Sequence, residues 1–375
     1  MGVDNLLTFV KNATTTTHIS ETSAPNSTVA VDISHWIYKA CYACPEALYH
    51  KKNLHVVYNT IVSYIENYVN LLEFHHIKIM FVFDGLKLPA KHITHQERAS
   101  KRNESRQMVE KLLASNNPTE ARKYMLRCIE IKFDIVQRVI DYCRRKRIEF
   151  IIAPYEADAQ LAFFNNNNIS EFIITEDTDL ILYGCKKIIY KLDTTGHCLL
   201  YERSRLSRCF GPHGVEFEKF RRMCILSGCD YLKNIPNVGL QSAKKFFLLT
   251  RQDNIRLLLP RLATYLKSPR LAGKVSEEYI NGFINAESTF KHHIVYDTEK
   301  QRLRPLEPYP KGCSSSDFPQ AGKRFHNILA AELVNGRINL DEIDPELDLD
   351  AGSDASDDEQ NHTDDCEKLP RPIKV

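Results

Sequence analysis

Acidic residues recur at the ends of apolar, strand-like segments of this sequence. Asp32 closes the run TVAVD and Asp84 closes IKIMFVFD, while Asp177 and Asp179 follow EFIIT. The carboxyl ends of parallel strands meet at one edge of an open α/β sheet, so these side chains should converge there. Clustered carboxylates raise each other's pKa unless cations neutralise them, and hard oxygen ligands select Mg²⁺ or Mn²⁺. The pattern predicts a two-metal phosphodiesterase.

Three further acidic residues fit the same site but also have ordinary structural explanations. Glu156 and Asp158 lie in APYEADAQLA, where Pro154 can open a helix and place both carboxylates in its first turn. The helix dipole favours acidic residues there, so capping and metal binding are both open for this motif. Asp230, in SGCDY, precedes a turn, where a lone Asp is usually an N-cap. The two aspartates after EFIIT favour the metal site, because like charges so close together need a cation between them.

A basic helix is predicted from Pro89 onward. At roughly 100° per residue, spacings of 4, 3, 4 and 4 place its cationic residues on one stripe, namely Lys91, His95, Arg98, Arg102 and Arg106. Such a stripe is usually a solvated face. This stripe begins only a few residues after Asp84, so its cations can also reach a phosphate held beside the carboxylates. Such a contact would not depend on the DNA sequence. Tyr38, on the helix expected after the first acidic strand end, could stack on a base or pack in the core.

The sequence after SGCDY predicts a turn followed by a helix. In IPNVGLQSAKKFF, Gly239 marks the turn, and a helix that opens near Ser242 carries Lys244 and Lys245. Backbone amides of a hairpin and of a helix start can bind a DNA phosphate. Ordinary packing of two helices joined by a turn explains the same pattern.

Strand-like and helical segments alternate along the chain, which is the rhythm of a mostly parallel sheet covered on both faces. The expected strands are 28–32, 77–83, 149–152, 172–175 and 187–192, and the clearest helical stretches are 57–74 and 118–147. The polar segment 11–27, rich in Thr and Ser, is predicted to be a loop. The fold class is therefore α/β.

The formal net charge of +2 conceals a division of charge along the chain. Between Asp341 and Glu367 there are 13 acidic residues and no Lys or Arg. The residues before 341 contain 47 Lys and Arg against 35 Asp and Glu, a net charge of +12. A basic body indicates a polyanionic partner such as nucleic acid. The acidic segment is too polar and like-charged to pack, so we predict disorder there, with solvation or partner binding as its role.

The eleven cysteines are scattered, and no apolar signal segment precedes them. No apolar run approaches the length of a membrane span. We therefore expect free thiols, a reducing intracellular compartment and no membrane association. The 375 residues and the 43% hydrophobic content suffice for a substantial core without disulfides.

Taken together, six segments resemble the XPG and flap-endonuclease superfamily, and most closely its exonuclease 1 branch. They are VAVDISHWIYKA, FVFDGLKLPAK, APYEADAQLAFF, ITEDTDLILYGCKK, CILSGCDYL and EEYINGFINAESTF. The resemblance covers about residues 1–340. It implies a PIN-like nuclease core with a helical arch in 1–110, further core in 111–225, and a helix-two-turn-helix with the rest of the core in 226–340.

The resemblance also implies roles for individual residues. Two Mg²⁺ ions, replaceable by Mn²⁺, would be surrounded by seven carboxylates, namely Asp32, Asp84, Glu156, Asp158, Asp177, Asp179 and Asp230. Lys91 and Arg98 occupy arch positions that polarise and steer the scissile phosphate. Ser227 and Val238 lie in the helix-two-turn-helix, which holds duplex DNA through backbone contacts and a K⁺ ion. The remaining candidate DNA contacts are Gly2, Tyr38, Arg102, Arg106, Gly239, Lys244 and Lys245.

The sequence departs from the family pattern at Asn237, Ala99 and Ser34 and in its C-terminal segment. Asn237 stands where relatives usually have the first Gly of the hairpin turn, and Asn tolerates the positive φ needed there. The long C-terminal extension through which relatives bind mismatch-repair partners is almost absent, and we find no sliding-clamp peptide. The sequence therefore identifies no protein partner, and we expect a monomer.

These observations predict a nuclear, Mg²⁺-dependent 5′-to-3′ exonuclease of DNA repair and recombination. Its substrates would be duplex DNA with 5′ ends, nicks, gaps or flaps, and it would also cut 5′ flaps. One alternative is a flap endonuclease of the same superfamily, which would release short oligonucleotides. Another is a catalytically weak scaffold that binds DNA ends. The seven carboxylates argue against the scaffold, because a pure binder has no use for their mutual repulsion.

Overall fold

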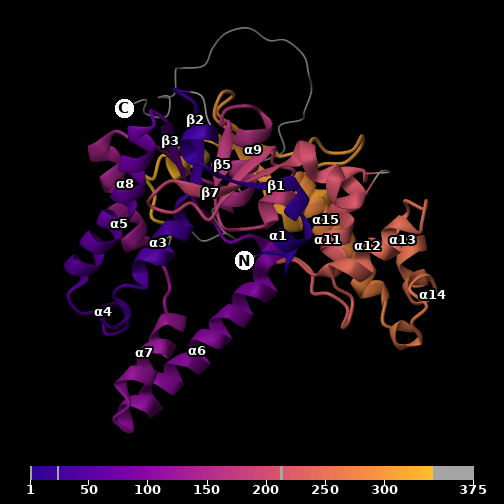
Figure 1. The fold of residues 1–375 in the computed structure, drawn as a ribbon, viewed down its shortest axis with the longest axis horizontal. Helices are drawn as coiled ribbons and strands as arrows, with labels where there is room; N and C mark the ends of the chain where they lie inside the picture. The colour runs from indigo at the N-terminus through magenta and orange to yellow at the C-terminus, as the bar shows by residue number, and fades with distance from the viewer. Residues whose placement is uncertain (1, 23–24, 212–213, 341–375) are drawn as a thin grey trace.

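A seven-stranded mixed sheet forms the centre of the computed structural model, which describes residues 2–22, 25–211 and 214–340 (Figure 1). The order of the strands across the sheet is β1-β7-β6-β5-β2-β3-β4. The strands are β1 Thr14–His18, β2 Thr28–Asp32, β3 Lys78–Phe83, β4 Glu149–Ile152, β5 Phe172–Ile174, β6 Lys187–Tyr190 and β7 His197–Glu202. Strands β2 to β6 pair in parallel, and β7 and β1 add antiparallel pairs at one edge. The predicted α/β class is confirmed.

The two antiparallel strands escaped the sequence analysis. The segment predicted to be a loop, 11–27, contains β1 and the short helix α2 (Ile19–Thr22), so that prediction was wrong. Strand β1 has the sequence TTTTH and lies at the edge of the sheet, where it leaves its side chains half-buried or exposed. Its signal was the β-branched Thr side chain, which favours extended backbone, rather than an apolar pattern.

Helices cover both faces of the sheet because the crossover connections run in two directions. Helices α3 (Ile33–Cys41), α5 (Leu54–Phe74) and α8 (Phe133–Lys146) lie in the connections from β2 to β3 and from β3 to β4. Helix α9 (Ala157–Asn166) leads back from β4 to β5, so right-handed crossovers place it on the opposite face. Helix α5 buries apolar residues at helical spacing, including Val57, Ile61, Ile65, Val69 and Leu72.

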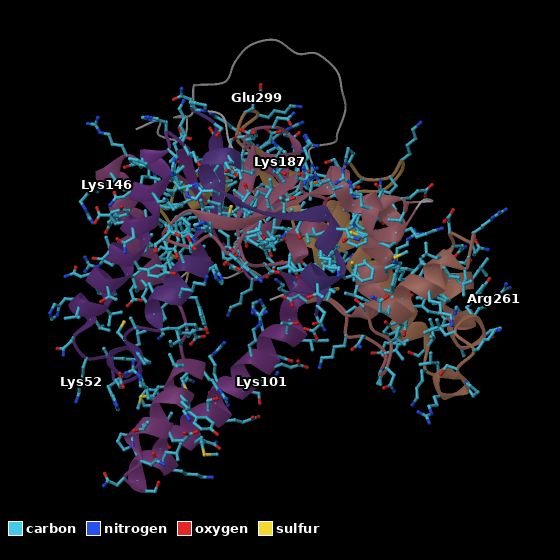
Figure 2. The ribbon with its side chains drawn as sticks, in the orientation of Figure 1. Lys52, Lys101, Lys146, Lys187, Arg261 and Glu299 are labelled. Atoms are coloured by element: carbon cyan, nitrogen blue, oxygen red, sulfur yellow. The ribbon has the colours of Figure 1, made fainter. Side chains whose placement is uncertain are left out.

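A helical hairpin projects from the core (Figure 1). It consists of the 3₁₀ turn η2 (Pro89–Lys91), helix α6 (His92–Ala114) and helix α7 (Pro118–Arg127), and we call it the arch. Lys101 marks α6 in Figure 2. The two helices are held together by a small apolar cluster, separate from the main core, which contains Val109, Ala121, Met125 and Cys128. The basic helix predicted from Pro89 is confirmed, with Lys91 in the turn before it.

The continuous helical stretch predicted over 118–147 was wrong. Helix α7 ends at Arg127 and α8 begins at Phe133. Between them Ile129 is buried, and its carbonyl oxygen accepts a hydrogen bond from the Tyr38 hydroxyl at 3.0 Å. Tertiary contacts of this kind override the helical preference of a short segment.

The C-terminal part of the described chain is largely helical. Its main elements are α11 (Phe217–Ser227), α12 (Leu240–Leu248) and α15 (Glu277–His292), followed by the hairpin of β8 (Ile294–Asp297) and β9 (Arg302–Pro305). The remaining elements are α1 Leu6–Phe9, α4 Pro45–Tyr49, α10 Asp179–Leu182, α13 Ile255–Leu258, α14 Leu262–Tyr265, α16 Asn327–Val334, η1 Lys11–Ala13, η3 Arg203–Phe210, η4 Leu259–Arg261, η5 Pro269–Leu271, η6 Ser315–Asp317 and η7 Pro319–Ala321.

The described residues contain neither a disulfide nor a membrane-spanning helix. The cysteines placed there are free thiols, as predicted. No helix in these ranges is both long and apolar enough to cross a bilayer. The segment 341–375, for which we predicted disorder, lies outside the described residues.

Candidate active site

The seven predicted carboxylates lie together at the carboxyl edge of the parallel strands, and we call them the carboxylate cluster. Asp32 is the last residue of β2, Asp84 follows the neighbouring β3, and Asp177 follows β5. The starts of α9 and α10 and the turn after α11 supply the other four, Glu156, Asp158, Asp179 and Asp230. Electrostatic interactions link all seven, so the predicted convergence is confirmed.

A series of hydrogen bonds orients Asp32, Asp177 and Asp179. The Thr175 hydroxyl donates to Asp32 Oδ2 at 2.9 Å and accepts from the Asp177 backbone N–H at 3.0 Å. Asp177 Oδ1 in turn accepts from the Asp179 N–H at 3.0 Å. Asp179 Oδ1 accepts from the Val3 N–H at 3.2 Å. Backbone groups therefore fix these carboxylates before any ligand binds.

Asp84 caps the helix that carries Glu156 and Asp158. Its Oδ1 accepts from the Ala157 N–H at 3.0 Å, and its Oδ2 accepts from the Ser34 hydroxyl at 2.7 Å. Glu156 is the N-cap residue of α9 but makes no side-chain cap, and Asp158 lies in the first turn. The expectation that both lie in the first turn therefore holds for Asp158 only, and capping does not explain Glu156.

The Lys91 ammonium group lies inside the carboxylate cluster. Its Nζ is 2.6 Å from Glu156 Oε1 and 3.2 Å from Asp230 Oδ2, and the residue is 7% exposed. Burial lowers the pKa of Lys91, but the two carboxylates outweigh it and raise that pKa well above its ordinary value. Arg98 Nη2 also lies 3.2 Å from Asp230 Oδ2. Burial opposes ionisation of Asp230, yet Lys91 and Arg98 lower its pKa, so Asp230 acts as an ion-pair partner and not as an N-cap.

These two cations do not neutralise the whole cluster. Burial, together with repulsion from Asp84 and Asp177, raises the pKa of Asp32 to about 7. Burial first, and then repulsion from Asp177, raises the pKa values of Asp158 and Asp179 well above their usual range. Burial also raises the pKa of Asp177. Ionising all seven carboxyls is therefore unfavourable with only these two cations present, and further cations would favour their ionised form.

The donor set suits a hard divalent cation because every side chain in it offers carboxylate oxygens. In the described ranges, however, no three His, Cys, Asp or Glu side chains form a ready-made metal-binding group. Lys91 already occupies Glu156 and Asp230, and Asp84 is engaged by Ser34 and Ala157. A metal ion that bound Glu156, Asp230 or Asp84 would therefore have to compete with these partners.

The amino-terminal segment packs against the cluster. A Cβ atom added to Gly2 would lie 2.5 Å from Asp177 Oδ1 and from Thr178 Oγ1, and the φ of Gly2 is +80°. Both facts require glycine at this position. Gly2 therefore lies directly beside Asp177 and Asp179 of the carboxylate cluster.

The cationic stripe of the arch leads outward from the cluster. Beyond Lys91 and Arg98, Arg102 Nη2 lies 2.9 Å from Glu130 Oε1, and Arg106 Nη2 lies 3.8 Å from Glu130 Oε2. His95 is half-buried, and burial lowers its pKa. Tyr38 is half-buried, with its ring 5.6 Å from that of Tyr42 and its hydroxyl bonded to Ile129, just after the arch. The structure thus brings the stripe, Tyr38 and the cluster to one side of the molecule.

The segment after the cluster forms the predicted helix, turn and helix. Asn237 has φ +69°, as expected for a residue that replaces Gly in the turn. Asn234 Nδ2 donates to the Val238 carbonyl at 3.2 Å, and the Ser227 hydroxyl donates to the Cys224 carbonyl at 2.8 Å. Helix α12 begins at Leu240 with Gly239 as its N-cap, which is two residues earlier than the predicted start near Ser242.

The two lysines of α12 differ in environment. Lys244 Nζ donates to the Cys209 carbonyl at 3.0 Å and lies 4.8 Å from the centre of the Phe210 ring. Lys245 is exposed. The Lys245 side chain is therefore accessible to solvent, whereas the Lys244 ammonium group makes its contacts within the protein.

Sequence reasoning missed several residues that shape the cluster. Thr175 and Ser34 orient two of its aspartates, and the Tyr231 hydroxyl donates to Glu156 Oε2 at 2.6 Å. Tyr231 directly follows Asp230 in SGCDY, and Thr175 ends EFIIT, so both were within the motifs. The sequence motifs contained Tyr231 and Thr175, but only the structure shows that they donate hydrogen bonds to the cluster.

Models of known families match the two parts of the chain that build the cluster. The XPG N-terminal domain matches residues 1–105, and the XPG I-region matches residues 147–230. These two ranges contain all seven carboxylates. The chain belongs to the XPG family.

Several sequence relatives of this XPG-family chain are named exonuclease 1 or exodeoxyribonuclease 1. Exonuclease 1 of Drosophila melanogaster is 41% identical over 85% of this chain and 42% of its own length. The DNA damage-inducible protein DIN7 of Saccharomyces cerevisiae is 32% identical over 84% of this chain and 71% of its own length. The chain spans less than half of the length of the exonuclease 1 relatives from fly, zebrafish and frog.

Solved structures confirm the fold expected of the family. The catalytic core of Rad2 in complex with DNA substrate has a TM-score of 0.57 and 18% identity, over 84% of this chain and 92% of its own. The Holliday junction-resolving enzyme GEN1 in complex with product DNA and Mg²⁺ has a TM-score of 0.52 and 16% identity, over 77% of this chain and 64% of its own.

Proposed function

We propose that this chain is a Mg²⁺-dependent DNA nuclease that removes nucleotides from duplex DNA in the 5′-to-3′ direction. It would start at 5′ ends, nicks or gaps, and it would also cut 5′ flaps. The observation that carries the proposal is the carboxylate cluster, in which Asp32, Glu156, Asp177 and Asp179 are buried, with Lys91 inside it and Arg98 at its rim. Carboxylates to hold cations and cations to hold a phosphate meet there, as phosphodiester hydrolysis requires.

Two divalent cations would be held by the carboxylate cluster. Asp32, Asp158, Asp177 and Asp179 carry the raised pKa values that a bound cation would relieve, and Asp84, Glu156 and Asp230 border them. When bound, the ions would supply an activated water and neutralise charge on the leaving oxygen. The GEN1 structure with Mg²⁺ and product DNA supports this assignment.

Lys91 and Arg98 would steer the scissile phosphate. Both cations lie 3.2 Å from Asp230 Oδ2, so a phosphate oxygen that takes the place of that carboxylate oxygen would meet both. The Arg98 guanidinium and the Lys91 ammonium group would then stabilise the extra negative charge of the transition state.

Duplex DNA would extend along two further surfaces. Arg102 and Arg106 would exchange Glu130 for backbone phosphates, and Tyr38 would face a base near the cut. Elsewhere, Gly239 at the start of α12 and Lys245 in its last turn would contact backbone phosphates, with K⁺ held near Ser227 and Val238. Lys244 would support that helix from within. A nuclear location would suit a nuclease that acts on damaged DNA, and the name of the DNA damage-inducible relative DIN7 supports it.

Cleavage of a nicked duplex tests the proposal. In a time course with Mg²⁺, the strand downstream of the nick is labelled at its 5′ terminus in one sample and at its 3′ terminus in the other. The two products distinguish the possible activities. We expect mononucleotides from the 5′ label and a ladder of shortening strands from the 3′ label. Release of short oligonucleotides would indicate a flap endonuclease instead, and uncut DNA that is nevertheless bound would indicate a scaffold.

A further inference from the structure

A line of hydrogen-bonded side chains runs from the carboxylate cluster into the core. The Tyr231 hydroxyl donates to Glu156 Oε2 at 2.6 Å. The Tyr183 hydroxyl lies 2.6 Å from that of Tyr231 and 2.8 Å from His293 Nδ1. Tyr183 caps the end of α10, and His293 caps the end of α15, which packs beside α11 (Figure 1). Three separate elements thus meet behind Glu156.

Packing leaves these side chains little freedom. Tyr183 is 1% exposed and His293 is 0% exposed. The Phe290 ring lies 5.0 Å from the Tyr183 ring and 4.8 Å from the Tyr231 ring. A buried polar side chain without a partner is destabilising, so each hydroxyl needs its neighbour in the line.

The direction of the hydrogen bonds follows from the carboxylate at one end. Glu156 pairs with Lys91 and therefore accepts, so Tyr231 must donate to it. Tyr183 then donates to Tyr231, and His293 Nδ1–H donates to Tyr183. Burial keeps His293 neutral by lowering its pKa to about 3. Its Nε2 has no hydrogen-bond partner in the described part of the chain. This is consistent with a proton on Nδ1, because Nε2 then carries only a lone pair and has no N–H to satisfy. Bonds aligned in this way strengthen one another.

The two oxygens of Glu156 consequently have different partners. Oε2 is held by the line of tyrosines, and Oε1 is 2.6 Å from Lys91 Nζ inside the cluster. We propose that Tyr183 and His293 are positioning residues that hold Glu156 through Tyr231. This inference rests on the metal-dependent function proposed above. Tyr183 and His293 keep Oε2 on the core side and leave Oε1 as the oxygen that faces a bound cation.

Binding of Mn²⁺ to the DNA-free protein tests this role apart from cleavage. Free Mn²⁺ measured by electron paramagnetic resonance gives the affinity of each variant, and calorimetry gives its Tm. Tyr183→Phe should weaken Mn²⁺ binding about tenfold, the effect typical of losing a partner that orients a metal ligand. Tyr201→Phe is the matched control, because Tyr201 is 0% exposed and its hydroxyl has no partner in the described ranges. It should bind Mn²⁺ like the wild type.

Two substitutions of His293 separate hydrogen bonding from packing. His293→Gln retains an N–H donor and should bind Mn²⁺ within about threefold of wild type, whereas His293→Leu should match Tyr183→Phe. Wild-type Mn²⁺ affinity in Tyr183→Phe and His293→Leu, with a lowered Tm alone, would show that the line only stabilises the core and would overturn the proposal. If the wild-type protein binds Mn²⁺ but cleaves no DNA, the proposed function fails while this test still stands.

Discussion

The carboxylate cluster and the arch carry charges of opposite sign, and the protein holds them in opposite ways. In the cluster, Asp32 and Asp177 are buried at strand ends and fixed by Thr175 and backbone N–H groups. In the arch, Arg102 and Arg106 are tied to Glu130 through half-exposed ion pairs on a projecting hairpin (Figure 1). Surface ion pairs contribute about 0–1 kcal/mol each, so they are readily exchanged for other partners.

The difference suggests a division of labour. A reacting centre needs groups held in position before the substrate arrives, which the rigid sheet edge supplies. A surface that takes in DNA needs cations that can change partners, which the arch supplies. Lys91 lies at the junction, because it belongs to the arch in sequence and to the cluster in space.

Removing one fixed carboxylate should give the largest effect. Asp177→Ala deletes an oxygen donor that also orients Asp179, so we expect cleavage to fall by more than about 10³-fold. Duplex binding should stay within a few-fold, because the arch is untouched. Single-turnover cleavage and fluorescence anisotropy on the same duplex measure the two quantities. Cleavage at near wild-type rate would show that Asp177 does not serve the metal site.

Lys91→Ala should give the next largest effect. Loss of one preorganised charge near the phosphate corresponds to roughly 3 kcal/mol, or a reduction in single-turnover rate of about 10²-fold. Lys101→Ala is the matched control, because Lys101 is an exposed lysine of the same arch. It should change DNA affinity slightly and the bound-state rate hardly at all. A severe loss of affinity with an intact rate in Lys91→Ala would assign Lys91 to the arch's binding role alone.

The same comparison explains which features could be predicted from the sequence. Asp32, Asp84 and Asp177 end apolar strands, so the register of the sheet fixes their location and the pattern alone indicated the cluster. The partners of the arch cations were not predictable, because Glu130 lies in a short break between two helices that the sequence pattern joined. Likewise Tyr183 and His293 are 110 positions apart, and only tertiary packing brings them into contact.

Substitution of one buried methionine in each region should separate local from global stability. Met125 is 3% exposed in the apolar cluster of the arch, and Met223 is 0% exposed in the main core. Met223→Ala should lower the free energy of unfolding by about 2–5 kcal/mol and lower the Tm. Met125→Ala should leave that Tm nearly unchanged but speed amide hydrogen exchange in 92–127. An equal loss of Tm in both variants would show that the arch unfolds together with the sheet.

The smallest expected effect is a pH dependence confined to the cluster. The pKa of Asp32 is raised from 3.8 to about 7 in the fold, so between these values the folded state holds a proton that the unfolded state releases. Stability of the metal-free protein should therefore decline as the pH rises from about 4 to about 7 and be unaffected by this group above that range. A divalent cation relieves repulsion only between ionised carboxylates, and protons compete with it.

The rise in Tm on adding Mg²⁺ should consequently be larger at pH 8 than at pH 6, by about 2–4 °C. Calorimetry at the two pH values measures this difference, and Asp32→Asn should reduce it because that side chain no longer titrates. Arg102→Ala, in the arch, should leave the difference unchanged, since its partner Glu130 lies outside the cluster. An Mg²⁺ effect on Tm that is equal at both pH values would mean that the cation binds away from the buried carboxylates.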